Sequence, residues 1–104
     1  PEGPTDIRIR NISIYVFDSL EINTSGGIHD YGPLNPNQVS EYKRFDKAYP
    51  KADIKLYSSD VKYEYGPVDY TYAVWLGRGK FTYDLNIVND SIYMEVTDRY
   101  PLDD

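Results

Sequence analysis

Apolar side chains recur at every second position through most of this 104-residue chain. The clearest run is Phe81, Tyr83, Leu85 and Ile87, and every residue between them is polar. A period of two places successive side chains on opposite faces of a β-strand, whereas an amphipathic helix needs a period of 3.6. The chain is therefore constrained to form sheets that each bury one face.

Turn residues separate the alternating runs at close intervals. The triplet Ser58-Ser59-Asp60 and the pair Asn89-Asp90 each stand between two runs and predict tight hairpins. The pattern predicts strands at residues 7–9, 20–22, 39–45, 52–56, 61–65, 81–87 and 92–96, with a short edge segment at 70–75. Short strands at this spacing indicate a single all-β domain, a β-sandwich of about seven strands that is immunoglobulin-like or transthyretin-like.

The segment from Ser40 to Ala48 leaves a second interpretation open. Its apolar residues Tyr42, Phe45 and Ala48 are spaced so that one or two turns of helix would also place them on one face. The strand interpretation ranks first because the segment is short and Pro50 would end a helix there.

Two short ends flank the expected domain. Residues 1–5 contain two prolines and one glycine, a composition typical of a flexible tether. The sandwich is expected at residues 6–100, and residues 101–104 are expected to form a C-terminal tail. The core of the sandwich is predicted from the inward positions of its strands, namely Ile7, Ile9, Leu20, Ile22, Ile54, Leu56, Phe81, Leu85, Ile87 and Met94.

Charge and composition argue against several classes of function. Acidic residues number 17 and basic residues 11, and the net charge of −6 without a basic patch argues against a nucleic-acid partner. Because cysteine is absent, the chain has no disulfide and no thiolate nucleophile. No apolar run approaches the ~20 residues of a membrane-spanning helix.

The stretch NTSGGIHDYG holds Gly26, Gly27, the only histidine (His29) and Asp30. A phosphate-binding loop would also need a lysine and a following helix, which this stretch lacks. A catalytic serine, histidine and carboxylate must converge in space, and residues adjacent in sequence rarely do so. The preferred interpretation is a wide loop between strands whose glycines supply positive φ, with a general-base role for His29 as the alternative.

Aromatic residues lie on both sides of the Gly66-Pro67 turn. Tyrosine and tryptophan rings offer large contact areas with a polar group at the edge, so an exposed set would suit a protein partner or a sugar. The interpretation ranked first, however, is that half of the rings face inward as core, because alternation alone does not say which face is buried. The candidate binding residues are Tyr63, Tyr65, Tyr70, Tyr72 and Trp75.

No catalytic, metal or cofactor site is expected from the sequence. One histidine and no cysteine provide too few zinc ligands, and no run resembles the calcium loop of an EF-hand. We therefore expect a protein that is not an enzyme. A hydrolase whose two carboxylates converge only in the folded chain is a further alternative.

Four segments carry a resemblance: IRIRNIS (7–13), INTSGG with YGPLNPNQVSEYKRF (22–27 and 31–45), AYPKADIKL (48–56) and GKFTYDLNI (79–87). Together they resemble the small extracytoplasmic lipoproteins of the Bacteroidetes type, a group without an assigned function. The resemblance implies export, a lipid anchor in the outer membrane or a periplasmic location, a small β-domain and no catalytic residues. This sequence lacks the cysteine that carries the lipid in that group, so the resemblance implies a cysteine that precedes Pro1.

These observations predict a domain of the cell envelope that acts as a non-catalytic binding or adhesion module. Its partner is expected to be a protein or a glycan, without a cofactor. Contact with the membrane is expected only through the N-terminal lipid anchor that lies outside this sequence. The alternative is a structural or assembly subunit of an envelope complex.

Overall fold

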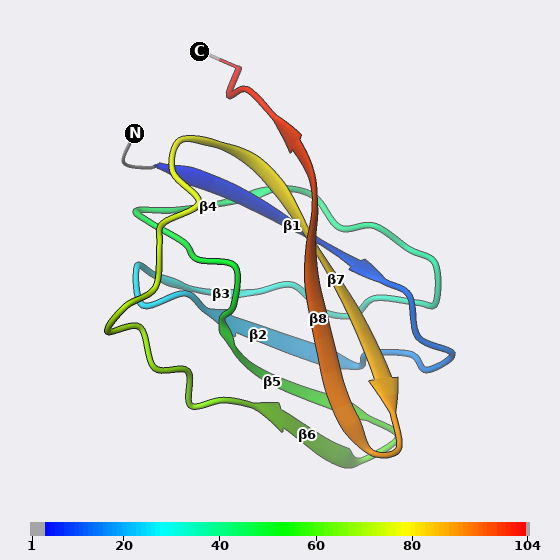
Figure 1. The fold of residues 1–104 in the computed structure, drawn as a ribbon. Helices are drawn as coiled ribbons and strands as arrows, with labels where there is room; N and C mark the ends of the chain where they lie inside the picture. The colour runs from blue at the N-terminus through cyan, green and yellow to red at the C-terminus, as the bar shows by residue number, and fades with distance from the viewer. Residues whose placement is uncertain (1–3, 104) are drawn as a thin grey trace.

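The computed structural model describes residues 4–103, which form eight β-strands and no helix (Figure 1). Within these residues, accordingly, no helix is long and apolar enough to cross a membrane. The strands are β1 (Thr5–Asn11), β2 (Ser19–Asn23), β3 (Ile28–Asp30), β4 (Lys43–Phe45), β5 (Asp53–Ser58), β6 (Val61–Tyr65), β7 (Gly79–Val88) and β8 (Ser91–Tyr100).

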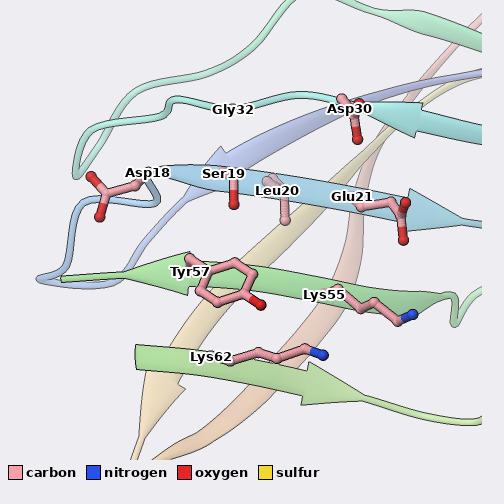
Figure 2. Close-up of a pocket in the computed structure, with 9 residues that line it drawn as sticks. All are labelled: Asp18, Ser19, Leu20, Glu21, Asp30, Gly32, Lys55, Tyr57 and Lys62. Atoms are coloured by element: carbon pink, nitrogen blue, oxygen red, sulfur yellow. The ribbon is translucent and has the colours of Figure 1, made fainter. Parts of the chain in front are cut away.

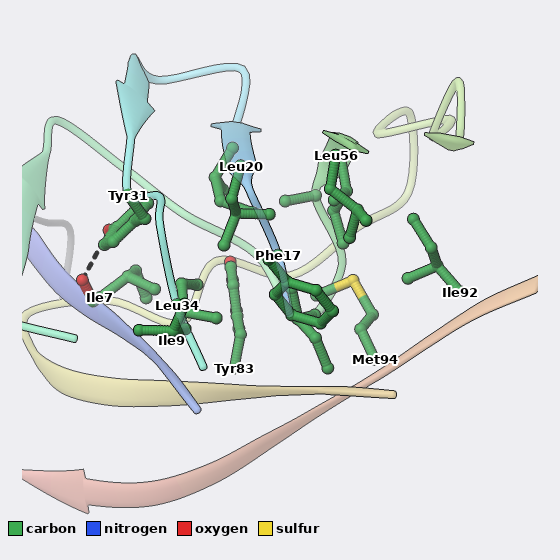
Figure 3. Close-up of a cluster of buried hydrophobic side chains, with 14 of the residues drawn as sticks. Ile7, Ile9, Phe17, Leu20, Tyr31, Leu34, Leu56, Tyr83, Ile92 and Met94 are labelled. Atoms are coloured by element: carbon green, nitrogen blue, oxygen red, sulfur yellow. Dashed lines mark hydrogen bonds between the residues drawn. The ribbon is translucent and has the colours of Figure 1, made fainter. Parts of the chain in front are cut away.

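The strands form two four-stranded sheets, with the orders β4-β1-β7-β8 and β3-β2-β5-β6. Strand β1 runs parallel to β7, and every other pair of neighbours is antiparallel. Apolar side chains from both sheets fill the space between them (Figure 3). The prediction of an all-β fold is confirmed.

The parallel pairing of β1 and β7 joins residues that are far apart in sequence. Its register runs from Thr5 opposite Gly79 to Asn11 opposite Leu85. Thr5 is buried, and its hydroxyl donates a hydrogen bond of 2.6 Å to the carbonyl of Gly77. Strand β1 therefore includes Thr5, which the sequence assigned to the tether; residues 1–3 of that tether lie outside the described residues.

All ten core residues predicted from the alternation are buried. Further buried side chains come from segments between the strands, including Phe17, Leu34 and Ala48. Two buried tyrosines satisfy their hydroxyl groups on backbone carbonyls: Tyr31 donates to Ile7 and Tyr83 to Tyr49, each at 2.6 Å. Burial raises the pKa of both phenols, so both remain neutral donors.

Both predicted hairpin turns are confirmed. Ser59 and Asp60 have φ values of 49° and 64°, and Asn89 and Asp90 have φ values of 51° and 63°. Two consecutive residues with positive φ match the right-handed twist of the strands that they connect. Asparagine and aspartate tolerate this backbone region better than most side chains.

The strand predicted at residues 39–45 is much shorter than expected. Of this segment, only β4 (Lys43–Phe45) pairs with β1 as a strand, and Val39 forms an isolated bridge with Arg10. Tyr42 lies on the outer face, with its ring 5.0 Å from the Arg8 guanidinium carbon. The alternative helix from Ser40 to Ala48 is also wrong.

The edge strand predicted at residues 70–75 does not form. After β6, Gly66 has a φ of 111° and Pro67 has no N–H to donate, so the ladder ends there. Thr71 then donates its N–H to the Asp69 carboxylate, which turns the chain. Residues 66–78, called the crossing loop below, run from the second sheet to the first (Figure 1).

An ion-pair network covers the outer face of the β4-β1-β7-β8 sheet. Asp98 accepts hydrogen bonds from Arg10 at 2.7 Å and from Arg8 at 3.1 Å, and Asp84 lies 3.2 Å from Arg10. The register of β7 and β8 shifts at Phe81, which leaves Asp98 as the extra residue of a bulge with a φ of 51°. The bulge aims the Asp98 carboxylate at both guanidinium groups.

Truncation of Leu85 tests the assignment of the core. Leu85→Ala removes a fully buried side chain and should lower the free energy of unfolding by about 2–5 kcal/mol. The control is Val88→Ala in the same strand, whose side chain is 43% exposed and whose loss should cost less than about 0.5 kcal/mol. Urea unfolding of the three proteins measures both changes. Equal losses for the two variants would contradict the burial of Leu85.

Replacement of Asp98 tests the outer network through its pH dependence. The hydrogen bond from Arg10, followed by that from Arg8, lowers the pKa of Asp98 below 3.8, so folding favours the carboxylate. This contribution is present above pH 3.8 and is lost as the pH falls through the lowered pKa. Asp98→Asn, which keeps a side chain tolerant of positive φ, should therefore be less stable than the wild type at neutral pH.

The stability difference between wild type and Asp98→Asn should shrink as the pH falls below about 3.8. Thermal unfolding from pH 7 to pH 2 measures it. Asp60→Asn, in an exposed turn away from the network, is the control. A difference for Asp98→Asn that stays constant over this range would show that the charge of Asp98 is not the cause.

Candidate functional site

The crossing loop carries three of the five predicted aromatic residues and is fixed to the sandwich at several points. The N–H of Val68 donates to the Asp53 carboxylate at 2.7 Å, and the N–H of Leu76 donates to the Ala48 carbonyl at 2.8 Å. These bonds hold both ends of the loop. The residues between Val68 and Leu76 therefore lie between two points that are anchored to the sandwich.

The apolar tip of the crossing loop consists of Tyr72, Val74 and Trp75, which are 94%, 77% and 38% exposed. The indole N–H of Trp75 donates to the hydroxyl of Tyr49 at 2.8 Å, and Lys47 Nζ lies 5.7 Å from the centre of the Trp75 ring. These contacts fix Trp75 while its neighbours remain in water. Exposed apolar side chains on a held loop are typical of a surface that binds a partner.

The five predicted aromatic residues do not form one surface. Tyr63 is a buried core residue, in agreement with the interpretation that half of these rings face inward. Tyr65 is partly buried against the core, with Lys51 Nζ 5.7 Å from its ring centre. Inward alternation along β6 explains both positions, because Lys62 and Glu64 take the outward ones.

Tyr70 also turns inward, although it belongs to the crossing loop. Its ring packs on Tyr49 with a centroid distance of 4.7 Å, and its hydroxyl donates to the carbonyl of Asn23 at 3.4 Å. Burial raises the pKa of Tyr70 to about 12. Of the predicted set, only Tyr72 and Trp75 therefore remain on the exposed tip.

The stretch NTSGGIHDYG forms a tight connection and a strand, not the wide loop that the sequence predicted. Gly27 has a φ of 150°, which agrees with the predicted role of the glycines, but Gly26 has no positive φ. A Cβ at Gly26 would lie 2.4 Å from the carbonyl oxygen of Lys47, so Gly26 is needed for close backbone approach.

His29 and Asp30 belong to β3 and point in opposite directions, as neighbours in a strand must. His29 Nε2 lies 2.7 Å from the carbonyl oxygen of Arg44, and its ring meets the edge of Phe45 at a centroid distance of 4.7 Å. His29 thus links β3 to β4 across the two sheets. Asp30 faces the other side, so the two residues cannot act as a pair.

A hollow of about 370 Å³ lies over the outer face of the β3-β2-β5-β6 sheet (Figure 2). Its lining combines acids, lysines, a hydroxyl group and one aromatic ring: Asp18, Ser19, Leu20, Glu21, Asp30, Gly32, Lys55, Tyr57 and Lys62. A second hollow of about 410 Å³ continues along the sheet towards Gly66 and shares Glu21 and Lys55 with the first. Both volumes fall in the range of small-ligand sites.

The pairing register places the hollow's charged residues in a row across the sheet. Asp30 lies opposite Glu21, Glu21 opposite Lys55, and Lys55 opposite Glu64. Like charges directly opposite each other on neighbouring strands are unfavourable, and Asp30 and Glu21 are such a pair. In the sequence, the alternation predicts that Glu21 and Lys55 face outward, but only the register could show that they are neighbours.

The arrangement can bind polar groups but lacks the features of an enclosed reaction site. Asp30 is exposed on an open sheet face, where water screens the charges that catalysis would use. Within residues 4–103, no group of three or more histidine or acidic side chains is placed to hold a metal ion.

Comparison with known proteins identifies no relative. No family model, curated protein or solved structure matches the chain.

The crossing loop's anchoring can be tested with two substitutions. Trp75→Phe removes the hydrogen bond to Tyr49 and should lower the free energy of unfolding by about 0.5–1.5 kcal/mol. Tyr72→Ala removes a side chain that is 94% exposed and should change it by less than about 0.5 kcal/mol. Denaturant unfolding measures both. A larger effect for Tyr72→Ala than for Trp75→Phe would contradict this account of the loop.

Proposed function

We propose that this chain is a non-catalytic binding module of the cell envelope that engages a protein partner through the apolar tip of its crossing loop. The observation that carries the proposal is the exposure of Tyr72 and Val74 on a loop whose ends are hydrogen-bonded to the sandwich. A held loop loses little conformational entropy on binding, and aromatic anchors dominate the energy of many protein interfaces.

The shape of the tip favours a protein over a sugar at this position. A sugar stacks on a flat, accessible ring, but Trp75 has Lys47 near its ring and its N–H directed to Tyr49. Tyr72 and Val74 instead expose apolar surface at the tip. Exposed apolar side chains of this kind suit a pocket on a protein partner.

A second copy of the chain is the partner in the alternative proposal, assembly of an envelope complex. In that case the tip would lie in an interface between copies. The two proposals differ in the identity of the molecule that contacts Tyr72.

A hydrolase is the weaker proposal. The pair of Glu21 and Asp30 offers two neighbouring carboxylates, but on an open sheet face. A glycosidase would use one carboxylic acid and one carboxylate around a bond held between them. The open face does not exclude water from such a bond.

The proposed location, exported and anchored by lipid to the outer membrane or free in the periplasm, is supported by the resemblance to Bacteroidetes-type lipoproteins. The transthyretin-like type of sandwich is proposed over the immunoglobulin-like type. In the immunoglobulin-like type the first strand pairs with the second. Here β1 lies between β4 and β7, while β2 belongs to the other sheet, which supports the transthyretin-like order.

Photo-crosslinking in the native cell envelope tests the proposed function. A benzophenone amino acid at position 72 should give a discrete crosslinked product with another protein, and Val74→Asp should abolish that product. The control is the same amino acid at position 93, an exposed tyrosine on β8. Products that are the same from both positions would overturn the proposal. A product of twice the chain's mass, with self-association in sedimentation, would favour assembly instead.

A further inference from the structure

We infer that the outer face of the β3-β2-β5-β6 sheet is a second binding site, whose ligand is a neutral oligosaccharide. This site is separate from the apolar tip and does not depend on the proposed function. It comprises the two continuous hollows that share Glu21 and Lys55.

The two outer faces of the sandwich differ in how their charges are used. On the first sheet, Arg8 and Arg10 are paired with acids. On the second sheet, Lys62 forms a salt bridge of 3.0 Å with Glu64 on its own strand. Glu21, Asp30 and Lys55 form no salt bridge or side-chain hydrogen bond within residues 4–103, although they are cross-strand neighbours.

Asp30, Glu21 and Lys55 thus form a line of unpaired hydrogen-bonding groups, and Glu64, which is paired with Lys62, ends the row. Neighbouring strands are about 4.8 Å apart, so the row from Asp30 through Glu21 and Lys55 to Glu64 spans about 14 Å. Carboxylates accept hydrogen bonds and the ammonium group donates them, whereas each sugar hydroxyl does both. A chain of hydroxyl groups can therefore satisfy the row, and it would also separate the like charges of Glu21 and Asp30.

Tyr57 supplies the apolar surface that a sugar ring needs. It is 44% exposed on β5, opposite Ser19 and Lys62 in the register, and it lines the first hollow. Figure 2 shows its ring on the sheet face beside the side chains of Lys55 and Lys62. One face of a pyranose presents C–H groups, which pack on an aromatic ring.

The mixed charges of the lining favour a neutral ligand. The first hollow has three carboxylates and two ammonium groups in its lining. An anionic ligand would meet those carboxylates and the net charge of −6. A cationic ligand would donate to the carboxylates but leave the ammonium groups without acceptors, whereas a polyhydroxylated ligand offers donors to the acids and acceptors to the lysines.

Titration of the ¹⁵N-labelled protein with defined sugars tests this inference. The probes are cellotriose, maltotriose, xylotriose and N,N′-diacetylchitobiose, with trigalacturonic acid as the anionic contrast. At least one neutral probe should shift the amide resonances of Glu21, Lys55 and Tyr57 saturably. Tyr57→Ala should weaken that binding by about tenfold or more. Tyr93→Ala, which removes an exposed tyrosine from the other sheet, should leave it within about twofold.

Lys55→Met serves as a second variant, because it keeps most of the side-chain length on an exposed position while removing the charge. It should weaken binding in the same direction as Tyr57→Ala. The inference is overturned if no neutral probe shifts these resonances at millimolar concentration, if only trigalacturonic acid does, or if neither variant weakens binding. Release of shorter sugars during the titration would show a hydrolase and would overturn a site for binding alone. None of these outcomes depends on Tyr72, so this site and the apolar tip can fail independently.

Discussion

The parallel pairing of β1 with β7 is the contact on which the rest of the sandwich depends. It places β1 inside the first sheet, between β4 and β7, and joins the beginning of the chain to the long hairpin of β7 and β8. Contacts between residues more than seventy positions apart carry a large cost in loop-closure entropy, so they must bury much surface to form. Here Ile7 and Ile9 are completely buried on the inner side, and Arg8 and Arg10, which alternate with them, form the ion pairs of the outer side.

The two outer faces of the sandwich differ in how their charged side chains are paired. On the first face, the charged side chains pair with one another. Asp98 has a positive φ, which is an unfavourable backbone conformation, and this conformation places its carboxylate within hydrogen-bond distance of Arg8 and Arg10. On the second face, Lys62 pairs with Glu64, whereas Glu21, Asp30 and Lys55 line a hollow and form no salt bridge within residues 4–103. Because each sheet needs only its inner face for the core, the outer faces are free to differ.

Short polar contacts, not further strands, hold the connecting segments. Asn11 is fully buried at the end of β1, where its side chain donates to the carbonyls of Tyr15 and Leu34 and accepts from Ser13. The side-chain amide of Asn11 thus fixes both the segment after β1, through Tyr15, and the segment after β3, through Leu34. The crossing loop is fixed in the same manner by hydrogen bonds to Asp53 and Tyr49. The tip of the loop is therefore exposed although its base is hydrogen-bonded to the sandwich.

The sequence by itself determined the all-β class, ten positions of the core and the hairpin turns, because these follow from local periodicity and backbone preference, whereas the tertiary structure added core residues such as Phe17, Leu34 and Ala48. All ten predicted core positions are buried, and Asn89-Asp90 forms the expected turn. The tertiary structure alone decided which side chains meet. Residues 70–75 alternate like a strand, but the turn at Asp69 and the contacts of the crossing loop direct them away from both sheets. They therefore pair with no strand. The row of Glu21, Asp30 and Lys55 exists only through the cross-strand register, and register depends on contacts between segments that are distant in sequence.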